Sequence, residues 1–257
     1  MSTVNQKLRK GDSAVGTMVR MIRNPGIAWL VRQAGLDLFM LDMEHGTYNT
    51  ETVADIATTA RAAGVGCFVR VPELAKGYVS RVLDCGCTGV MVPMIESVEQ
   101  AELLVRWSKF EPVGGRGFGS VGGHTNYQGI GGADTVDFTL RANEEVLTIA
   151  QIETRAGMEQ VEKIAALEGI DALLIGPSDL SMSLGHTGDM KHAEVIEAID
   201  RIATAAQKND KVFSIHGPDW LIEQFRPKGL NLIMSALDMN MLLGGMKSIS
   251  DKWGSSK

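Results

Sequence analysis

The chain has 257 residues, of which 44% are hydrophobic and 22% charged, and its net charge is −6 at pH 7. This acidic balance disfavours a nucleic-acid partner, because phosphate binding needs a basic surface, and no apolar run is long enough to cross a bilayer. The basic residues near the start precede no apolar segment, so we expect no signal peptide. Three cysteines, an odd number, indicate reduced thiols, and we expect a cytoplasmic protein.

Eight short apolar runs are predicted to be strands, with helical periodicity between them. Several runs, such as LFML and GVMV, are continuous rather than alternating, as in strands buried on both faces. The expected strands are Ala14–Val19, Leu36–Leu41, Gly66–Val71, Gly89–Pro93, Leu147–Ile152, Ala172–Ile175, Lys211–Ile215 and Leu230–Met234. This alternation favours an α/β fold, a single (β/α)8 TIM barrel domain over residues 1–257, with an open doubly wound sheet as the alternative.

Five segments between or after these strands carry helical periodicity. Proline at a first helical position predicts that Asn24 caps the first helix, and S-V-E-Q predicts that Ser97 caps the third. The expected helices are Pro25–Ala34, Thr50–Ala63, Ser97–Trp107, Val195–Lys208 and the C-terminal Ser235–Trp253. The last is unusually apolar, and a partner subunit could cover the part of its surface that one barrel leaves exposed.

A glycine-rich segment, Val113–Thr139, interrupts the alternation. A segment this long without clear periodicity is typical of a functional loop, and its position between the fourth and fifth strands predicts that it lies near the catalytic rim. It contains a literal G-x-G-x-x-G at Gly117, Gly119 and Gly122. We interpret this match as accidental, because the residues that follow make a poor helix and a dinucleotide site needs one.

Two acidic residues, Glu153 and Asp179, follow apolar runs and are expected at the same edge of a parallel sheet. A buried carboxylate is costly unless it is paired or bound to a metal. Two carboxylates with water and substrate oxygens suit Mg²⁺, Mn²⁺ or Co²⁺. The alternative is that Glu153 pairs with Arg155 or another surface charge and that Asp179 caps a helix.

Asp42 and His45 follow the second strand and are expected on the same rim. A carboxylate that accepts a hydrogen bond from one imidazole nitrogen fixes the tautomer and raises the basicity of the other. His45 is therefore the general-base candidate, with a structural histidine in a turn as the alternative. His124, in the glycine-rich segment, is a candidate for a second-sphere role. The remaining histidines have no supporting context, although His216 also follows a strand.

Arg70 ends the third strand, where a cation is expected to face an anion. Its guanidinium could bind a carboxylate and stabilise an enolate oxygen; the alternative is a salt bridge to Asp42 or Asp84. Gln151 lies two residues before Glu153, so both side chains face the barrel mouth. Its amide is predicted to contact the substrate or a metal-bound water.

Six motifs together resemble the HpcH/HpaI aldolase family, the class II metal-dependent pyruvate aldolases of 2,4-dihydroxyhept-2-ene-1,7-dioate aldolase type. They are LDMEHG at 41–46, FVRVP at 68–72, the segment Leu83–Ser97, GGRGFGS at 114–120, AQIETRAG at 150–157 and IGPSDLSMSLG at 175–185. The resemblance covers nearly the whole chain and implies a TIM barrel of the phosphoenolpyruvate/pyruvate type. QIET and GPSDLS at this separation are its most specific part.

The resemblance also implies roles for the rim residues. Glu153 and Asp179 would bind the metal, and backbone N–H groups around Ser178 and Asp179 would bind the carboxylate of a 2-oxo acid. Arg70 would stabilise the pyruvate enolate.

Further implications concern proton transfer and assembly. His45, oriented by Asp42, would move the proton of the aldol hydroxyl through water, and Asp84 would support the histidine of a neighbouring subunit. Family members are typically hexamers, trimers of dimers, that exchange the C-terminal helix between protomers, which would account for the apolar segment Ser235–Trp253.

The implied reaction is reversible cleavage of a 4-hydroxy-2-oxo acid into pyruvate, or a close 2-oxo acid, and an aldehyde through a metal-stabilised enolate. The segment Gly114–Phe138 departs from the family pattern, so the aldehyde portion of the substrate is expected to differ. Alternatives are an oxaloacetate-type decarboxylase or other carbon–carbon lyase, and a non-catalytic binder of 2-oxo acids. A citrate-lyase-type enzyme acting on acyl-CoA esters ranks lower, because the chain has no basic cluster suited to the phosphates of CoA.

Overall fold

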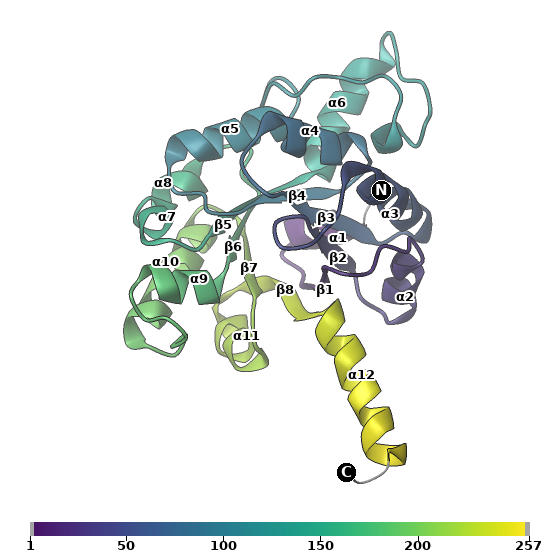
Figure 1. Ribbon diagram of the computed structural model, residues 1–257. Coiled ribbons are helices and arrows are strands. Elements are labelled where there is room, and N and C mark those ends of the chain that lie inside the picture. The colour runs from purple at the N-terminus through teal and green to yellow at the C-terminus, as the bar shows by residue number, and fades with distance from the viewer. Residues whose placement is uncertain (1–2, 255–257) are drawn as a thin grey trace.

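A closed barrel of parallel strands forms the centre of the computed structural model, which describes residues 3–254 (Figure 1). Each strand pairs in parallel with the next, and β8 pairs with β1. The strands are β1 Ala14–Val19, β2 Leu38–Asp42, β3 Gly66–Arg70, β4 Gly89–Val92, β5 Leu147–Ile152, β6 Ala172–Ile175, β7 Val212–His216 and β8 Leu230–Leu237. The predicted (β/α)8 barrel is confirmed, and the open sheet is wrong.

The helices surround the barrel (Figure 1). They are α1 Thr3–Arg9, α2 Ile27–Gln33, α3 Thr50–Ala63, α4 Lys76–Asp84, α5 Val98–Ser108, α6 Asp134–Glu145, α7 Arg155–Glu159, α8 Val161–Ala166, α9 Pro177–Ser183, α10 Ala193–Lys208, α11 Asp219–Phe225 and α12 Asp238–Trp253, with short 3₁₀ turns η1 Gly123–Thr125 and η2 Arg226–Lys228. Within this part of the chain no helix is long and apolar enough to span a membrane.

Two apolar cores stabilise this arrangement. The outer core lies between the strands and the surrounding helices. The inner core fills the barrel with side chains such as Met40, Phe68 and Met91, and Val4 and Leu8 of α1 belong to it. Because α1 precedes β1 and packs against this inner core, it closes the amino-terminal end of the barrel and leaves the carboxyl ends of the strands open.

Helix capping agrees with the sequence at one of the two predicted positions. The hydroxyl of Ser97 accepts the N–H of Gln100 at 3.3 Å, as the S-V-E-Q pattern predicts. The cap predicted at Asn24 is wrong: α2 begins at Ile27, and Asn24 Oδ1 accepts the N–H of Gly26 at 2.8 Å instead. Asparagine readily forms this local turn, which delays the start of the helix.

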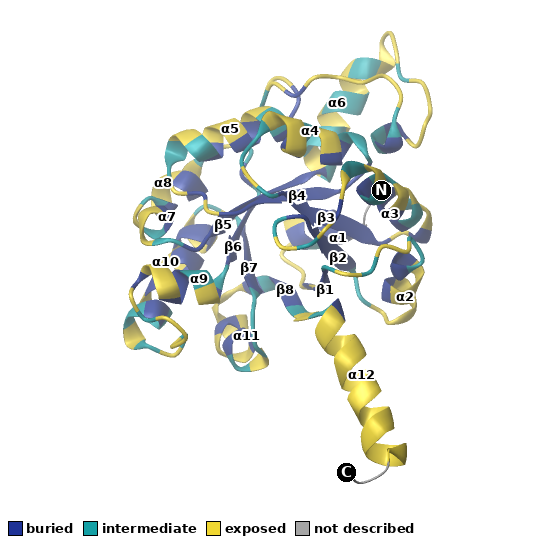
Figure 2. Ribbon diagram, in the orientation of Figure 1, coloured by how far each residue is buried: buried dark blue, intermediate teal, exposed yellow. Residues whose placement is uncertain are grey.

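The glycine-rich segment differs from its prediction in two ways. Its last part is helical, because α6 begins at Asp134 with two acidic residues in its first turn, where they interact favourably with the helix dipole. No residue of α6 is buried, which explains its weak periodicity (Figure 2). The segment also follows α5, which returns the chain to the amino-terminal end of the barrel. The prediction that it lies near the catalytic rim of its own chain is therefore wrong.

The C-terminal helix α12 projects away from the barrel (Figures 1 and 2). It begins at Asp238 rather than Ser235, because residues 235–237 extend β8. Asp238 is its only buried residue, and its exposed apolar side chains are Met239, Met241, Leu242, Leu243, Met246, Ile249 and Trp253. The three cysteines are free thiols, as the sequence predicts.

Candidate active site at the barrel mouth

A cavity of about 210 Å³ opens at the carboxyl ends of the strands. Two larger hollows, of about 580 and 560 Å³, lie away from this end and do not include the predicted site residues. The cavity brings together five of the predicted residues, and its lining is Met18, Arg20, His45, Arg70, Met91, Gln151, Leu174, Gly176, Pro177, Ser178, Asp179 and His216. The chemistry of this lining, rather than the size of the cavity, identifies it as the candidate site.

Glu153 follows β5 and is only 2% exposed. Its carboxylate accepts the backbone N–H of Met94 at 3.0 Å and a hydrogen bond from the amide of Gln151. Burial raises the pKa of Glu153 to about 7, and the nearby carboxylates of Asp179 and Glu44 contribute. The side chain is therefore a buried acid in a region of concentrated negative charge.

Both alternatives for the two acids are wrong. Arg155 binds Glu194 at 3.0 Å rather than Glu153. The N-cap of α9 is Gly176, and no side chain caps that end. Asp179, half-buried in the first turn of α9, makes no hydrogen bond to any residue in the described part of the chain, so its carboxylate is free to bind a ligand.

The surroundings of Glu153 suit a bound cation. The backbone of Gly176 approaches its carboxylate so closely that a Cβ at this position would collide with Glu153 Oε2. Because the Gln151 amide group donates to Glu153, its Oε1 points elsewhere, and this buried oxygen has no hydrogen-bond partner among the described residues. Carboxylate and amide oxygens are ligands that hard divalent cations prefer.

The raised pKa of Glu153 predicts a pH-dependent stability of the metal-free protein. The ordinary pKa is 4.5 and the folded value is about 7, so between these values the folded state holds a proton that the unfolded state has lost. The free energy of unfolding should therefore fall as pH rises through this window. Melting temperatures measured in EDTA from pH 4.5 to 7.5 test this, with Glu153→Gln as the control. Equal slopes in both proteins would contradict the expectation.

Asp42 on β2 and Arg70 on β3 lie opposite each other in the sheet and form a buried, bidentate ion pair. Arg70 Nε and Nη2 donate to the two carboxylate oxygens of Asp42 at 2.9 and 2.6 Å. Burial alone would raise the pKa of Asp42, but the hydrogen bonds and charge of Arg70 hold it below its usual value. Arg70 Nη1 also lies 2.9 Å from Glu44 Oε2. The salt bridge considered as the alternative for Arg70 is thus present, at the cavity wall.

His45 is placed differently from the sequence expectation. Asp42 Oδ1 accepts the backbone N–H groups of Glu44 and His45 at 3.1 and 3.3 Å, not the imidazole, because Arg70 and Arg20 occupy the carboxylate. The His45 side chain is 53% exposed, and its Nε2 lies 3.7 Å from Glu44 Oε2. Asp42 therefore positions the backbone that carries His45, and the unpredicted Glu44 is the carboxylate nearest its ring.

Two further basic residues line the cavity, Arg20 and His216. Arg20 was not predicted, and His216 was seen to follow a strand but was given no role. Arg20 follows β1 and donates through Nε to Asp42 Oδ2 at 2.8 Å. His216 ends β7, and its Nε2 lies 3.2 Å from the carbonyl oxygen of Ala236. Each comes directly after a predicted strand, which is the signal that identified Glu153 and could have identified them too.

Asp84 and His124 lie outside this cavity. Asp84 ends α4 and accepts a hydrogen bond from Arg116 at 2.6 Å. His124 contacts the carbonyl oxygens of Asp84 and Gly119, at 3.3 and 2.8 Å. Within the described chain neither reaches the barrel mouth, so a role for Asp84 at a neighbouring subunit's site stays a prediction.

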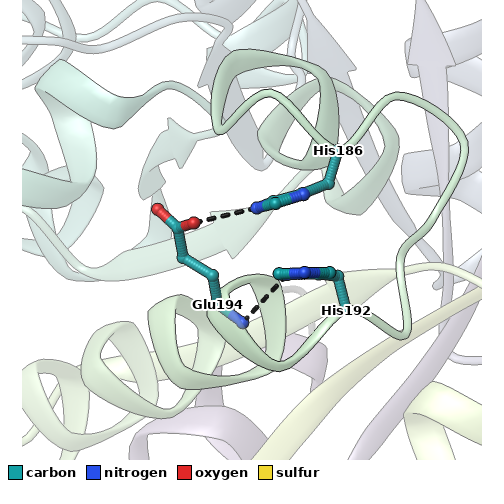
Figure 3. Close-up of side chains that lie close together, drawn as sticks. All are labelled: His186, His192 and Glu194. Atoms are coloured by element: carbon teal, nitrogen blue, oxygen red, sulfur yellow. Dashed lines mark hydrogen bonds and ion pairs between the residues drawn. The ribbon is translucent and has the colours of Figure 1, made fainter.

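A separate cluster of His186, His192 and Glu194 is close enough to hold a metal ion (Figure 3). The two imidazoles stack with centroids 3.4 Å apart, and His186 Nε2 lies 2.8 Å from Glu194 Oε2. His192 Nδ1 accepts the N–H of Glu194 and thereby caps α10. The Arg155 ion pair and the positive end of α10 both oppose a further cation here. We therefore interpret this cluster as a helix cap.

Comparisons with known proteins identify one family and several relatives that are named as aldolases. The family model described as HpcH/HpaI aldolase/citrate lyase matches residues 21–243. A hydroxypyruvate/pyruvate aldolase of Paraburkholderia phytofirmans is 35% identical over 93% of this chain and 93% of its own. A 5-keto-4-deoxy-D-glucarate aldolase of Klebsiella pneumoniae is 34% identical over 77% of this chain and 75% of its own. The crystal structure of an HpcH/HpaI aldolase from Desulfitobacterium hafniense superimposes with a TM-score of 0.90 at 30% identity, covering 99% of both chains.

Proposed function

This chain belongs to the HpcH/HpaI aldolase/citrate lyase family of carbon–carbon lyases, and from that membership we propose that it reversibly cleaves a 4-hydroxy-2-oxo acid into pyruvate, or a close 2-oxo acid, and an aldehyde. The observation that carries the proposal is the buried carboxylate of Glu153, with Asp179 nearby and Arg70 on the same cavity. The named activities of the relatives support the same reaction class.

A divalent cation, Mg²⁺, Mn²⁺ or Co²⁺, is proposed to bind between Glu153 and Asp179. Such an ion polarises a 2-oxo group and stabilises the negative charge that develops on its oxygen. The buried Glu153, the free Asp179 and the unpartnered Oε1 of Gln151 fit this ion. Gln151 would contact either the substrate or a water molecule beside it.

Other residues of the chain would orient the substrate. The guanidinium of Arg70, held rigidly by Asp42 and Glu44, would stabilise the enolate oxygen as charge develops there. The backbone N–H groups of Ser178 and Asp179, in the first turn of α9, would bind the carboxylate of the 2-oxo acid.

His45 is proposed as the general base. It would take the proton from the C4 hydroxyl, through water, as the C3–C4 bond breaks. The electron pair of that bond passes into the enolate, C4 leaves as the aldehyde, and protonation at C3 completes the 2-oxo acid. The exposed ring of His45 reaches the cavity, and Glu44 beside it would stabilise the imidazolium.

Metal removal tests the function. We expect pyruvate release from 4-hydroxy-2-oxo acids in an assay coupled to lactate dehydrogenase, its loss in EDTA and its recovery with Mn²⁺. Metal-independent release, or none from any such acid, would overturn the proposal. Carbon dioxide release from oxaloacetate without aldol cleavage would favour the decarboxylase, and 2-oxo acid binding without turnover would favour the non-catalytic binder.

We also propose a homo-oligomer, a hexamer in which α12 packs on a neighbouring subunit. The apolar side chains of α12 have no cover in the single chain, and Trp29 and Leu30 of α2 are exposed as well. The double variant Leu242→Asp/Met246→Asp should reduce the mass found by light scattering toward the 27.7 kDa of one chain. An unchanged mass would argue against assembly through α12, and Lys247→Ala is the matched control.

A cytoplasmic location is proposed from the free cysteines.

A further inference from the structure

Two basic residues of the barrel mouth, Arg20 and His216, have no part in the proposed chemistry. They follow β1 and end β7, the two strands that flank β8, and both line the cavity. Burial, the charge of Arg70 and, last, the charge of Arg20 lower the pKa of His216. What they do depends on which of their polar atoms are free.

The imidazole of His216 is oriented by the backbone of β8. Its Nε2 lies 3.2 Å from the carbonyl oxygen of Ala236, which also accepts a hydrogen bond from Thr17 Oγ1 at 3.4 Å. A carbonyl oxygen only accepts hydrogen bonds, so Nε2 carries the hydrogen and donates it. Burial lowers the pKa of His216, and in the neutral ring Nδ1 is then an acceptor. Nδ1 has no hydrogen-bond partner among residues 3–254.

Ala236 holds this carbonyl in place with a strained backbone. Its φ of +63° is in the left-handed region, which side chains other than glycine rarely adopt. Strained residues of this kind persist where the surrounding structure holds them, and they concentrate at functional sites. The backbone conformation of Ala236 on β8 therefore fixes the carbonyl oxygen that orients His216 on β7.

Arg20 supplies the complementary hydrogen-bond donors. Its Nε is committed to Asp42 Oδ2, and Asp42 is itself held by Arg70. Its Nη1 and Nη2 make no hydrogen bond to the part of the chain that the structure describes. The guanidinium is thus anchored at one edge and free at the other, beside the cavity.

One chemical group can form a hydrogen bond with each of the two residues. A hydroxyl accepts from an Arg20 Nη group through its oxygen and donates its hydrogen to His216 Nδ1. A carboxylate could only accept, which would leave Nδ1 facing a lone pair, and a methyl group would leave both residues unpaired. We propose that Arg20 and His216 form a hydroxyl-binding subsite, so that this enzyme prefers hydroxylated substrates. This inference rests on the proposed aldol function.

The hydroxyl has two sources, C3 of the 2-oxo acid or the carbon next to the aldehyde. Four syntheses separate them: pyruvate or hydroxypyruvate with propanal or lactaldehyde, in which each pair of reactants differs by one hydroxyl. The measured quantity is the ratio of kcat/KM for the hydroxylated and unhydroxylated reactant. There are two comparisons, or arms: hydroxypyruvate against pyruvate, and lactaldehyde against propanal. We expect His216→Leu to lower the ratio about tenfold in one of these arms, because a hydrogen bond is lost and its polar partner is left unpaired.

Matched variants separate recognition from packing. His216→Asn retains an acceptor oxygen and should restore part of the ratio, whereas Met18→Leu alters the neighbouring wall without changing a polar atom and should leave it within about twofold. Arg20→Met should lower the ratio in the same arm as His216→Leu. If His216→Leu leaves the ratio unchanged in both arms, or slows both members of each pair equally, the subsite is refuted.

A binding measurement keeps the two proposals apart. Aldol activity with an unchanged ratio removes the subsite and leaves the aldolase function intact. If the wild-type protein shows no aldol activity, calorimetric dissociation constants for hydroxypyruvate and pyruvate decide the matter. The same titration compares lactaldehyde with propanal. A selective loss of affinity for the hydroxylated member of either pair in His216→Leu then supports the subsite, and an equal or absent loss in both pairs overturns it.

Discussion

Replacing Glu153 with alanine is expected to lower kcat/KM for retro-aldol cleavage by at least about a thousandfold and to weaken Mn²⁺ binding with it. The carboxylate is buried, and Met94 and Gln151 hold it in one position. The backbone of Gly176 lies directly against the carboxylate. The loss should therefore affect metal affinity and turnover together.

Two measurements check this expectation: pyruvate release in the coupled assay and calorimetric titration with Mn²⁺. Glu159→Ala, which removes an exposed carboxylate from α7, the helix that follows β5, is the matched control and should change neither. If Glu153→Ala kept the wild-type affinity for Mn²⁺, the assignment of Glu153 as a ligand would be wrong.

Replacing Arg70 with methionine is the second large perturbation. It removes two hydrogen bonds from the fully buried carboxylate of Asp42 and one ion pair from Glu44. Loss of one partner of a buried pair costs about 3–5 kcal/mol, because an uncompensated charge remains. Arg20 still contacts Asp42, so we expect the lower end of this range. Activity should fall by at least about a hundredfold.

A double variant separates the two roles of Arg70. In Asp42→Asn/Arg70→Met the buried charge is removed along with its partner, so most of the free energy of unfolding should return. Aldol cleavage should not return, because the group proposed to face the enolate is still missing. Denaturant unfolding and the coupled assay measure the two effects. Recovery of activity in the double variant would show that Arg70 serves only to neutralise Asp42.

The barrel and the position of its acids were predictable from the chain because they depend on strand ends. Continuous apolar runs identify strands buried on both faces, and parallel strands bring their carboxyl ends to one rim. Glu153 and Asp179 each follow such a run, so their common location needed no knowledge of side-chain conformation. Arg20 and His216 carry the same signal but belong to no recognised motif.

The partners of the site residues were not predictable in the same way. Spacing places Asp42, His45 and Arg70 on one rim, but it does not say which nitrogen reaches the carboxylate. Arg70 lies opposite Asp42 across two paired strands and presents a fork that matches a carboxylate. It therefore binds the oxygens that the sequence assigned to the imidazole of His45. The glycine-rich segment was predicted near the catalytic rim because it follows the fourth strand. In the structure α5 comes between them and returns the chain to the opposite end of the barrel.

The absence of a side chain at Gly176 also limits how this protein can mutate. Every amino acid other than glycine has a Cβ, and at this position that carbon would collide with the Glu153 carboxylate. No single-nucleotide missense change in the Gly176 codon is therefore conservative. A library randomised at this codon and selected for growth on the enzyme's substrate as the sole carbon source should return glycine alone, even though Gly176 itself forms no bond with a substrate in the proposed reaction.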